Sequence, residues 1–202
     1  GHILGAACVR FDDGTRSVAF TGAVGRPHDP VIRAPEPPPA ADHLVTESTY
    51  GNRIHPADDP ADMLCDIVNR TLGRGGTVLL PAFAVGRTQT LLFLLSQLRD
   101  AGRIPEVPTY VNSPMAIDAT ELFWSHPEEH RLTEAQAASM GRGVTLVRTM
   151  EDSMALTPRD GPMIVISASG MMSGGRVLHH LQTVAPNHRN TIVITGFQAA
   201  GT

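Results

Sequence analysis

Arg87, Ser113 and Arg176 each lie within or directly after a loop that carries Gly, Pro or Ser and follows a short apolar segment. Each loop leads into a predicted helix, whose first backbone N–H groups can bind an anion. A cation at a helix start is unfavourable by about 0.3–1 kcal/mol, so Arg87 and Arg176 suggest a phosphate between them. One such loop alone would indicate only a tight turn with a solvent-facing arginine. Three loops together favour phosphate or nucleic-acid binding.

Residues 44–53 bring a lone carboxylate to the end of an apolar segment. Leu44 and Val45 predict a buried strand, and Glu47 follows them just before a polar, Gly-containing loop. Strand ends that lead into loops are where α/β proteins place their chemistry. Glu47 is therefore a candidate catalytic carboxylate.

The histidines give weaker signals. His126 and His130 have the i, i+4 spacing of a metal pair but lack a third ligand nearby, which favours an ordinary helix start. His179 and His180 are adjacent on a predicted helix and cannot both face one site. His2 alone indicates a structural or exposed residue. The chain contains no HxHxDH, GxSxG or Walker motif.

The turn residues and apolar periodicity predict an α/β fold. The Asp-Gly turn at residues 12–14 predicts a hairpin between residues 3–11 and 17–21. From residue 58 onward, helices alternate with short apolar strands, which is typical of a parallel sheet covered on both faces. The main predicted helices are residues 58–72, 86–101, 115–124 and 175–184, and the strands are residues 77–80, 109–111, 163–166 and 191–195. In such a sheet, the three loops lie at one edge.

The composition is that of a globular protein, with 42% hydrophobic and 18% charged residues among 202. The net charge of −4 excludes nucleic-acid binding by bulk charge, so such binding needs a local patch. Cys8 and Cys65 lack CxxC spacing, which favours a reducing, cytoplasmic location over a disulfide framework. No apolar run approaches the ~20 residues of a membrane span. The chain starts without Met and ends without a tail, so we expect a segment of a longer protein.

Six segments resemble the β-CASP branch of the metallo-β-lactamase-fold hydrolases, which includes the RNA-cleaving 3′-end-processing endonuclease subunit and its bacterial and archaeal relatives. In chain order they are GHILGA, TGAVGRPHDP, VTESTYGNRIHP, LLPAFAVGRTQTLLFLL, YVNSPMA and SASGMMSGGRVLHHL. The resemblance covers essentially the whole chain. It implies that residues 1–50 and 188–202 belong to a metallo-β-lactamase domain of αββα type. Residues 51–187 would form the inserted β-CASP domain, built on a parallel sheet flanked by helices.

The resemblance implies a zinc-dependent ribonuclease with two zinc ions between these domains. A bridging hydroxide would attack the scissile phosphodiester of RNA. His2 would ligate zinc, and Glu47 would orient a catalytic histidine that donates a proton. The positions that would line the RNA cleft are Arg87, Ser113, Ser169, Gly170 and Arg176.

The chain departs from the family pattern at Ala23, where the family has the Asp that bridges the two metals. The HxHxDH motif and the later histidine motifs are also absent, and one His cannot make a tetrahedral zinc site. We therefore expect the isolated chain to be inactive. An alternative is a catalytically degenerate module that binds RNA or a protein partner, and a third interpretation is an unrelated phosphate-binding domain. RNA versus DNA, endo- versus exonucleolytic action and a homodimer stay open.

Overall fold

The chain divides into two units in the computed structural model, which describes residues 1–55 and 57–202. The first unit comprises Gly1–Ala57 and His126–Arg131, and the second comprises Asp58–Ser125 and Leu132–Thr202. The domain limits proposed at residues 50 and 187 stay predictions. In the described part of the chain, no helix is long and apolar enough to cross a membrane.

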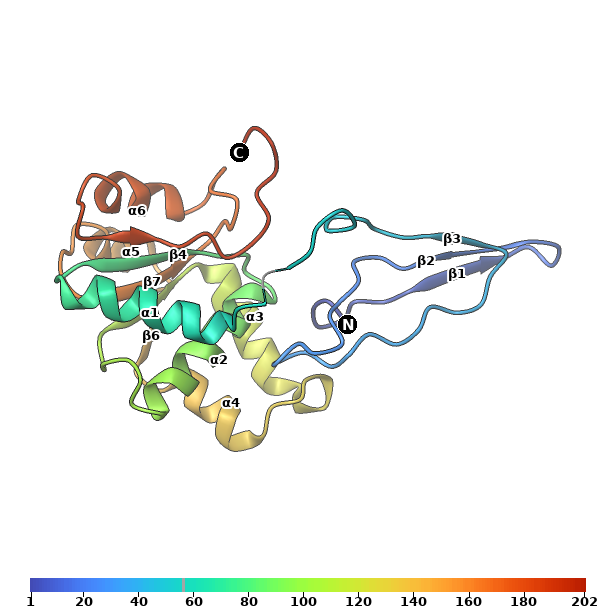
Figure 1. Cartoon of the computed structure of the whole chain (residues 1–202), viewed down its shortest axis with the longest axis horizontal. Coiled ribbons are helices and arrows are strands. Elements are labelled where there is room, and N and C mark those ends of the chain that lie inside the picture. Colours follow the sequence, from blue (N-terminus) through green and yellow to red (C-terminus); the bar gives the residue numbers. More distant parts are fainter. Residues whose placement is uncertain (56) are drawn as a thin grey trace. The chain divides into compact units, whose positions relative to one another are not determined.

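A parallel five-stranded sheet organises the second unit (Figure 1). Its strands are β4 (Thr77–Pro81), β5 (Thr109–Asn112), β6 (Val144–Leu146), β7 (Met163–Ser167) and β8 (Thr191–Ile192). Their spatial order is β6-β5-β7-β4-β8, and every pair is parallel. The predicted alternation of helices and strands is confirmed, although β8 is shorter than expected.

Helices cover both faces of this sheet. They are α1 (Pro60–Gly73), α2 (Arg87–Asp100), α3 (Pro114–Ser125), α4 (Glu134–Gly141), α5 (Met150–Leu156) and α6 (Val177–Val184). Asp59, Thr133 and Thr149 each accept a backbone N–H of the following helix, so the sequence itself supplies three N-caps. In Figure 1, α1 and α2 lie on one side of the sheet and α5 and α6 on the other.

The strand residues are apolar on both sides because both faces of the sheet are buried. Leu79, Tyr110 and Val165 share one face and pack in a cluster with apolar side chains of α5 and α6. Leu80 and Ile166 point to the opposite face and are also fully buried. Near-continuous apolar strands are therefore the sequence pattern that this layered core requires.

The connections after β4 and β7 run in opposite directions, although these strands are neighbours. The chain passes from β4 through α2 to β5, and from β7 through α6 to β8, with α2 and α6 on opposite faces. Such a reversal is a topological switch point, where α/β sheets form their ligand crevice at the carboxyl ends of the strands. The topology alone therefore indicates the loops after β4 and β7 as the place of a ligand site, independently of any sequence motif.

The first unit contains a three-stranded sheet of β1 (Val9–Asp12), β2 (Ser17–Phe20) and β3 (His43–Val45). The predicted hairpin is confirmed by the antiparallel pairing of β1 with β2, although β1 starts at Val9 rather than at Ile3. The prediction of a buried strand before Glu47 is wrong, because Leu44 and Val45 are 54% and 50% exposed. Within the described residues this thin sheet has one apolar face that is left in solvent.

That exposed face is defined by the strand register. Val9 is paired with Phe20 and Phe20 with Val45, so all three side chains point to one side. Phe11 joins them, with its ring centroid 6.0 Å from that of Phe20 in an edge-to-face arrangement. Every one of these four side chains is at least 40% exposed. We call them the hairpin face.

A buried glutamine holds the loop between β4 and α2. Gln89 is 2% exposed, and its side-chain amide donates to Thr120 Oγ1 at 2.8 Å and to Ala84 O at 3.1 Å, while its carbonyl accepts the Gly86 N–H at 2.6 Å.

We expect Gln89→Leu to lower the free energy of unfolding by about 2–4 kcal/mol, because it leaves buried polar groups without a hydrogen-bond partner. Gln182→Leu, at an exposed position of α6, should change it by less than about 0.5 kcal/mol. Urea unfolding measures both, and equal losses would contradict this role.

Candidate active site

The loops after β4, β5 and β7 lie next to one another at what we call the carboxyl edge of the sheet. β7 pairs with β4 on one side and with β5 on the other, so the ends of all three strands adjoin. The N–H of Ala82 donates to Ser167 O at 3.0 Å, which joins the first loop to the third. The prediction that these three loops share one edge is confirmed.

The predicted RNA-contacting serines and glycine lie in these loops with different exposure. Ser113 is 6% exposed, and its Oγ accepts the Ala116 N–H at 3.2 Å, so this side chain caps α3. Ser169 is half-buried in the loop after β7. Gly170 is buried against the loop after β4, where an added Cβ would lie 2.9 Å from Phe83 N. The two loops at the switch point can approach this closely only because residue 170 has no side chain.

The guanidinium of Arg176 donates its hydrogen bonds to acceptors inside the protein. Nη1 donates to Asn112 Oδ1 at 3.0 Å and to Val147 O at 2.9 Å, and Nη2 donates to Arg148 O at 2.9 Å. These acceptors lie at the ends of β5 and β6, so Arg176 fastens two strand ends to the start of α6. A cation at this helix start is therefore explained without an anion, and its contact with RNA stays a prediction.

Asn112 is the centre of a buried polar network that the sequence pattern does not predict. Its side-chain amide lies 2.9 Å from Ser153 Oγ and 2.7 Å from His180 Nε2, and its own oxygen accepts from Arg176. Its backbone carbonyl accepts the Ser167 hydroxyl at 3.0 Å. Asn112, Ser153 and His180 are each at most 3% exposed. All hydrogen-bonding groups of the Asn112 side chain are used, which fixes its orientation.

His180 is held neutral in this network. Burial lowers the pKa of His180 to about 4, and the nearby charges of His179 and Arg176 act in the same direction. The neutral ring can accept the Asn112 amide proton at Nε2, which an imidazolium could not do. As the sequence predicted, the two histidines diverge: His180 is buried and His179 is exposed.

Arg87 is the first residue of α2, and its side chain is exposed. It stands at the switch-point loop that also carries Phe83, which is 44% exposed. The position suits a phosphate contact at a helix N-terminus. Its assignment to RNA stays a prediction.

Glu47 is exposed at the turn after β3, and two backbone amides hold its carboxylate in place. Oε2 accepts the Thr49 N–H at 3.0 Å, and Oε1 accepts the Val24 N–H at 3.1 Å. The hydrogen bonds from Thr49 and then from Val24 lower the pKa of Glu47, and the neighbouring His2 adds a smaller electrostatic contribution in the same direction. Glu47 is therefore ionised at neutral pH and joins its turn to the loop that contains Ala23.

His2 lies near this carboxylate, and its backbone packs closely on Gly25. A Cβ on Gly25 would lie 2.1 Å from Gly1 O and 2.7 Å from His2 N. Residues 1–55 and 57–202 contain no group of three His, Cys, Asp or Glu side chains that could hold a metal ion. His2 can supply at most one ligand of the zinc site that the resemblance implies, and Ala23 adds no oxygen ligand.

The His126 and His130 pair makes no metal site in the described structure. His126 Nδ1 pairs with Glu128 at 2.9 Å in a short 3₁₀ turn, Pro127–Glu129. His130 is 3% exposed and forms a backbone bridge with Ile32. The preference for a structural interpretation of this pair agrees with these contacts.

Replacing Arg176 tests its role at the carboxyl edge. We expect Arg176→Lys to lower the free energy of unfolding by about 2–4 kcal/mol, because an ammonium group cannot reach all three acceptors of the guanidinium. Arg70→Lys, the same change at an exposed position in the last turn of α1, should alter it by less than about 0.5 kcal/mol. Urea unfolding measures the free energy of unfolding of both variants. An unchanged value for Arg176→Lys would show that the internal hydrogen bonds of Arg176 do not hold the strand ends.

The depressed pKa of His180 predicts a dependence of stability on pH. Because the folded protein binds this proton only near pH 4 and the unfolded chain near pH 6.5, acidification through this range favours unfolding. We expect His180→Gln to lose less stability than the wild type between pH 7 and pH 4, by on the order of 3 kcal/mol. His179→Gln should retain the wild-type profile. Parallel profiles for all three proteins would show that His180 does not titrate in this way.

A model of the Beta-Casp domain matches residues 88–202 of this chain, which is more than half of its length. The whole chain is also similar to known proteins. It is 35% identical over 208 residues to Ribonuclease TTHA0252 of Thermus thermophilus, of which it covers 48%. It is 34% identical to Transcription termination factor FttA of Methanosarcina mazei, covering 34% of that protein, and 30% identical to Endoribonuclease ysh1 of Schizosaccharomyces pombe, covering 27%.

The chain thus spans about half or less of these curated relatives. The domain match covers four of the five strands of the parallel sheet, helices α3 to α6 and most of α2, and the last two of the six sequence segments. Two of the three relatives carry ribonuclease names. The chain therefore belongs to the β-CASP family of metallo-β-lactamase-fold proteins.

Proposed function

We propose that this chain is part of a zinc-dependent hydrolase that cleaves phosphodiester bonds in RNA. The observation that carries the proposal is the ionised Glu47 carboxylate, which two amides hold at the turn after β3 in a β-CASP protein. Names of relatives such as ribonuclease and endoribonuclease support RNA as the substrate class.

In this proposal, the residues of the chain bind and orient rather than supply the nucleophile. Glu47 accepts a hydrogen bond from a catalytic histidine and fixes its orientation, as the resemblance implies. Arg87 and Ser169 contact RNA at the carboxyl edge, and the buried Ser113 and Gly170 shape the loops that carry this contact. Arg176 keeps that edge in shape through its three internal hydrogen bonds.

Zinc dependence requires more ligands than this chain supplies. Zinc when bound would activate a water for attack on phosphorus. His2 is the one residue here that we propose as a ligand, and further ligands would have to come from outside the described residues.

A second candidate is a catalytically degenerate β-CASP protein that binds RNA or a protein partner. Ala23 favours it, because an exposed methyl group stands where the family has a metal-bridging carboxylate. A cytoplasmic location and a homodimer are further parts of our proposal that await measurement.

Zinc content and RNA cleavage separate the two candidates in the full gene product that carries these 202 residues. We expect the wild type to hold fewer than two zinc ions per chain by mass spectrometry. Ala23→Asp should restore the second ion and raise cleavage of a single-stranded RNA oligonucleotide, because it returns a carboxylate to the loop. Val24→Asp, at the adjacent exposed position, is the matched control and should do neither.

Glu47→Gln supplies the complementary loss of function. It should lower the cleavage rate about 10²–10⁴-fold while RNA affinity is unchanged. If the wild type holds two zinc ions and is fully active, the enzyme proposal stands, and another group must replace the missing Asp. If neither the wild type nor Ala23→Asp binds zinc or cleaves RNA, the enzyme proposal is wrong and the binding module stands.

A further inference from the structure

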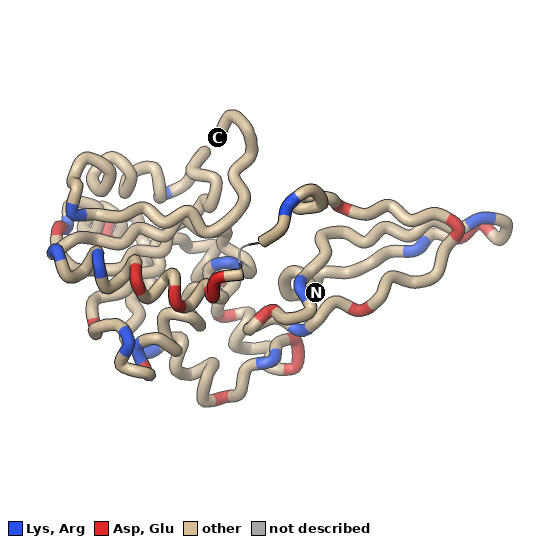
Figure 2. Tube along the Cα trace, viewed as in Figure 1, with Lys and Arg blue, Asp and Glu red and all other residues tan. Residues whose placement is uncertain are grey.

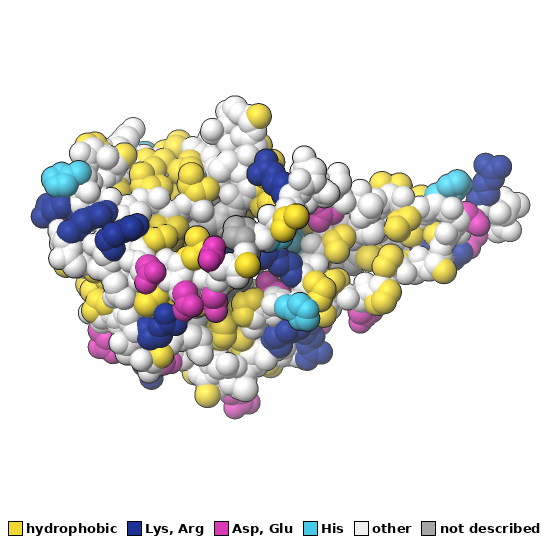
Figure 3. Space-filling model, viewed as in Figure 1, with side chains coloured by type: hydrophobic (Ala, Val, Ile, Leu, Met, Phe, Trp, Pro, Cys, Tyr) yellow, Lys and Arg dark blue, Asp and Glu magenta, His cyan; other side chains and the backbone are white. Residues whose placement is uncertain are grey.

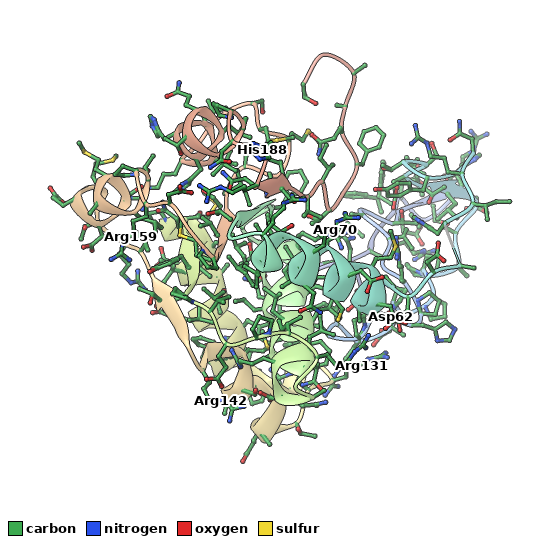
Figure 4. All side chains as sticks on the ribbon, turned by 60° about the vertical axis from the view of Figure 1, so that its left-hand side comes forward. Asp62, Arg70, Arg131, Arg142, Arg159 and His188 are labelled. Carbon is green, nitrogen blue, oxygen red and sulfur yellow. The ribbon has the colours of Figure 1, made fainter. Side chains whose placement is uncertain are left out.

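A group of basic side chains lies at the edge of the sheet opposite the carboxyl edge. Arg70 and Arg74 come from the end of α1, and His188 and Arg189 come from the loop that leads into β8. We call these four residues the amino-edge patch. Figure 3 shows arginines and a histidine gathered at this end of the second unit, and Figure 4 labels Arg70 and His188 on the two elements.

Hydrogen bonds hold the two segments of the patch together. Arg74 donates to Arg189 O through Nε at 2.5 Å, and through Nη2 to Asn190 O at 3.0 Å and to Thr191 Oγ1 at 2.6 Å. The side-chain oxygen of Asn190 accepts the N–H of Thr77, the first residue of β4, at 2.7 Å. The patch is therefore built on the amino ends of β4 and β8 rather than on a loose loop.

The distribution of charge on α1 makes the patch distinct. Figure 2 shows acidic residues along the first part of α1 and arginines at its end, in a chain whose net charge is −4. The helix dipole favours cations at a helix C-terminus and so accounts for Arg70 and Arg74. It does not account for His188 and Arg189, which reach the same place from another segment.

The acidic partner of Arg189 is weakly held. Arg189 Nη2 pairs with Asp160 Oδ2 at 2.7 Å, and the two side chains are 43% and 58% exposed. Exposed ion pairs contribute little to stability, so Arg189 can exchange this carboxylate for another anion. Arg70 and His188 are also exposed.

We propose that the amino-edge patch binds the phosphates of single-stranded RNA that extends beyond the carboxyl edge. This inference rests on the proposed function, because it extends the path of the same substrate. The five residues of β4 separate the two edges by about 16 Å. One strand advances by about 3.4 Å or more per nucleotide. A dinucleotide at the carboxyl edge is therefore too short to reach the patch, whereas an RNA of about 30 nucleotides can contact both.

The test measures affinity for an RNA dinucleotide and for an RNA of about 30 nucleotides at several salt concentrations. Arg70→Gln combined with Arg189→Gln should weaken binding of the long RNA roughly tenfold and leave the short RNA unaffected. The salt dependence of log K should become shallower by about 0.7 for each phosphate that the double variant no longer binds. Arg74 is left intact because its guanidinium holds the loop before β8.

Two further variants sharpen the result. Asp160→Asn should tighten binding of the long RNA about two- to threefold, because it removes the competing carboxylate and keeps the oxygen that accepts the Gly161 N–H. Arg142→Gln removes an exposed arginine that pairs with Asp100 near the start of β6, at the far end of the sheet, and should have no effect.

Unchanged binding of the long RNA by the double variant would overturn the proposal, as would an equal loss in Arg142→Gln, which would indicate bulk charge. Competition by poly-glutamate as strong as that by RNA would instead indicate an acidic protein partner and would also overturn it. The proposed function fails separately, if the wild type neither binds nor cleaves RNA of either length.

Discussion

The guanidinium of Arg176 is the contact on which the carboxyl edge depends. Parallel strands that end inside a protein leave carbonyl groups that need donors, and a buried acceptor without a partner is costly. Arg176 supplies three donors at once, to the ends of β5 and β6, from the start of α6. Asn112 also links the end of β5 to α5 and α6 through its hydrogen bonds with Ser153 and His180. The strand ends and the start of α6, which carry the loops that we assign to RNA, are therefore held by a buried network of hydrogen bonds.

Much of the larger unit could be predicted from the sequence because its core has a simple pattern. Strands buried on both faces give short apolar runs, and amphipathic helices with Asp59 or Thr133 as caps mark the segments between them. The same reasoning failed at Leu44 and Val45. An apolar pair predicts a strand correctly, but whether another layer covers that strand is a tertiary property that the pair does not encode.

The candidate site was predictable only in part, for a related reason. Residue type and strand-end position selected Glu47, Ser113 and the loop around Gly170, and the structure places them in turns or loops at strand ends. Arg176 shows the limit, since an arginine at a helix start fits both an anion site and an internal clamp. The sequence predicted that His179 and His180 diverge but not that His180 bonds to Asn112, because that contact joins residues that are 68 positions apart.

The hairpin face has a consequence for how the protein becomes folded. The larger unit buries apolar side chains on both faces of its sheet, so it holds its own core. The three-stranded sheet leaves Val9, Phe11, Phe20 and Val45 in water and gains little from collapse on its own. In the isolated 202-residue chain we therefore expect β1 to β3 to open more readily than the sheet of the larger unit. Their backbone amides should exchange with solvent sooner than those of β4 and β7.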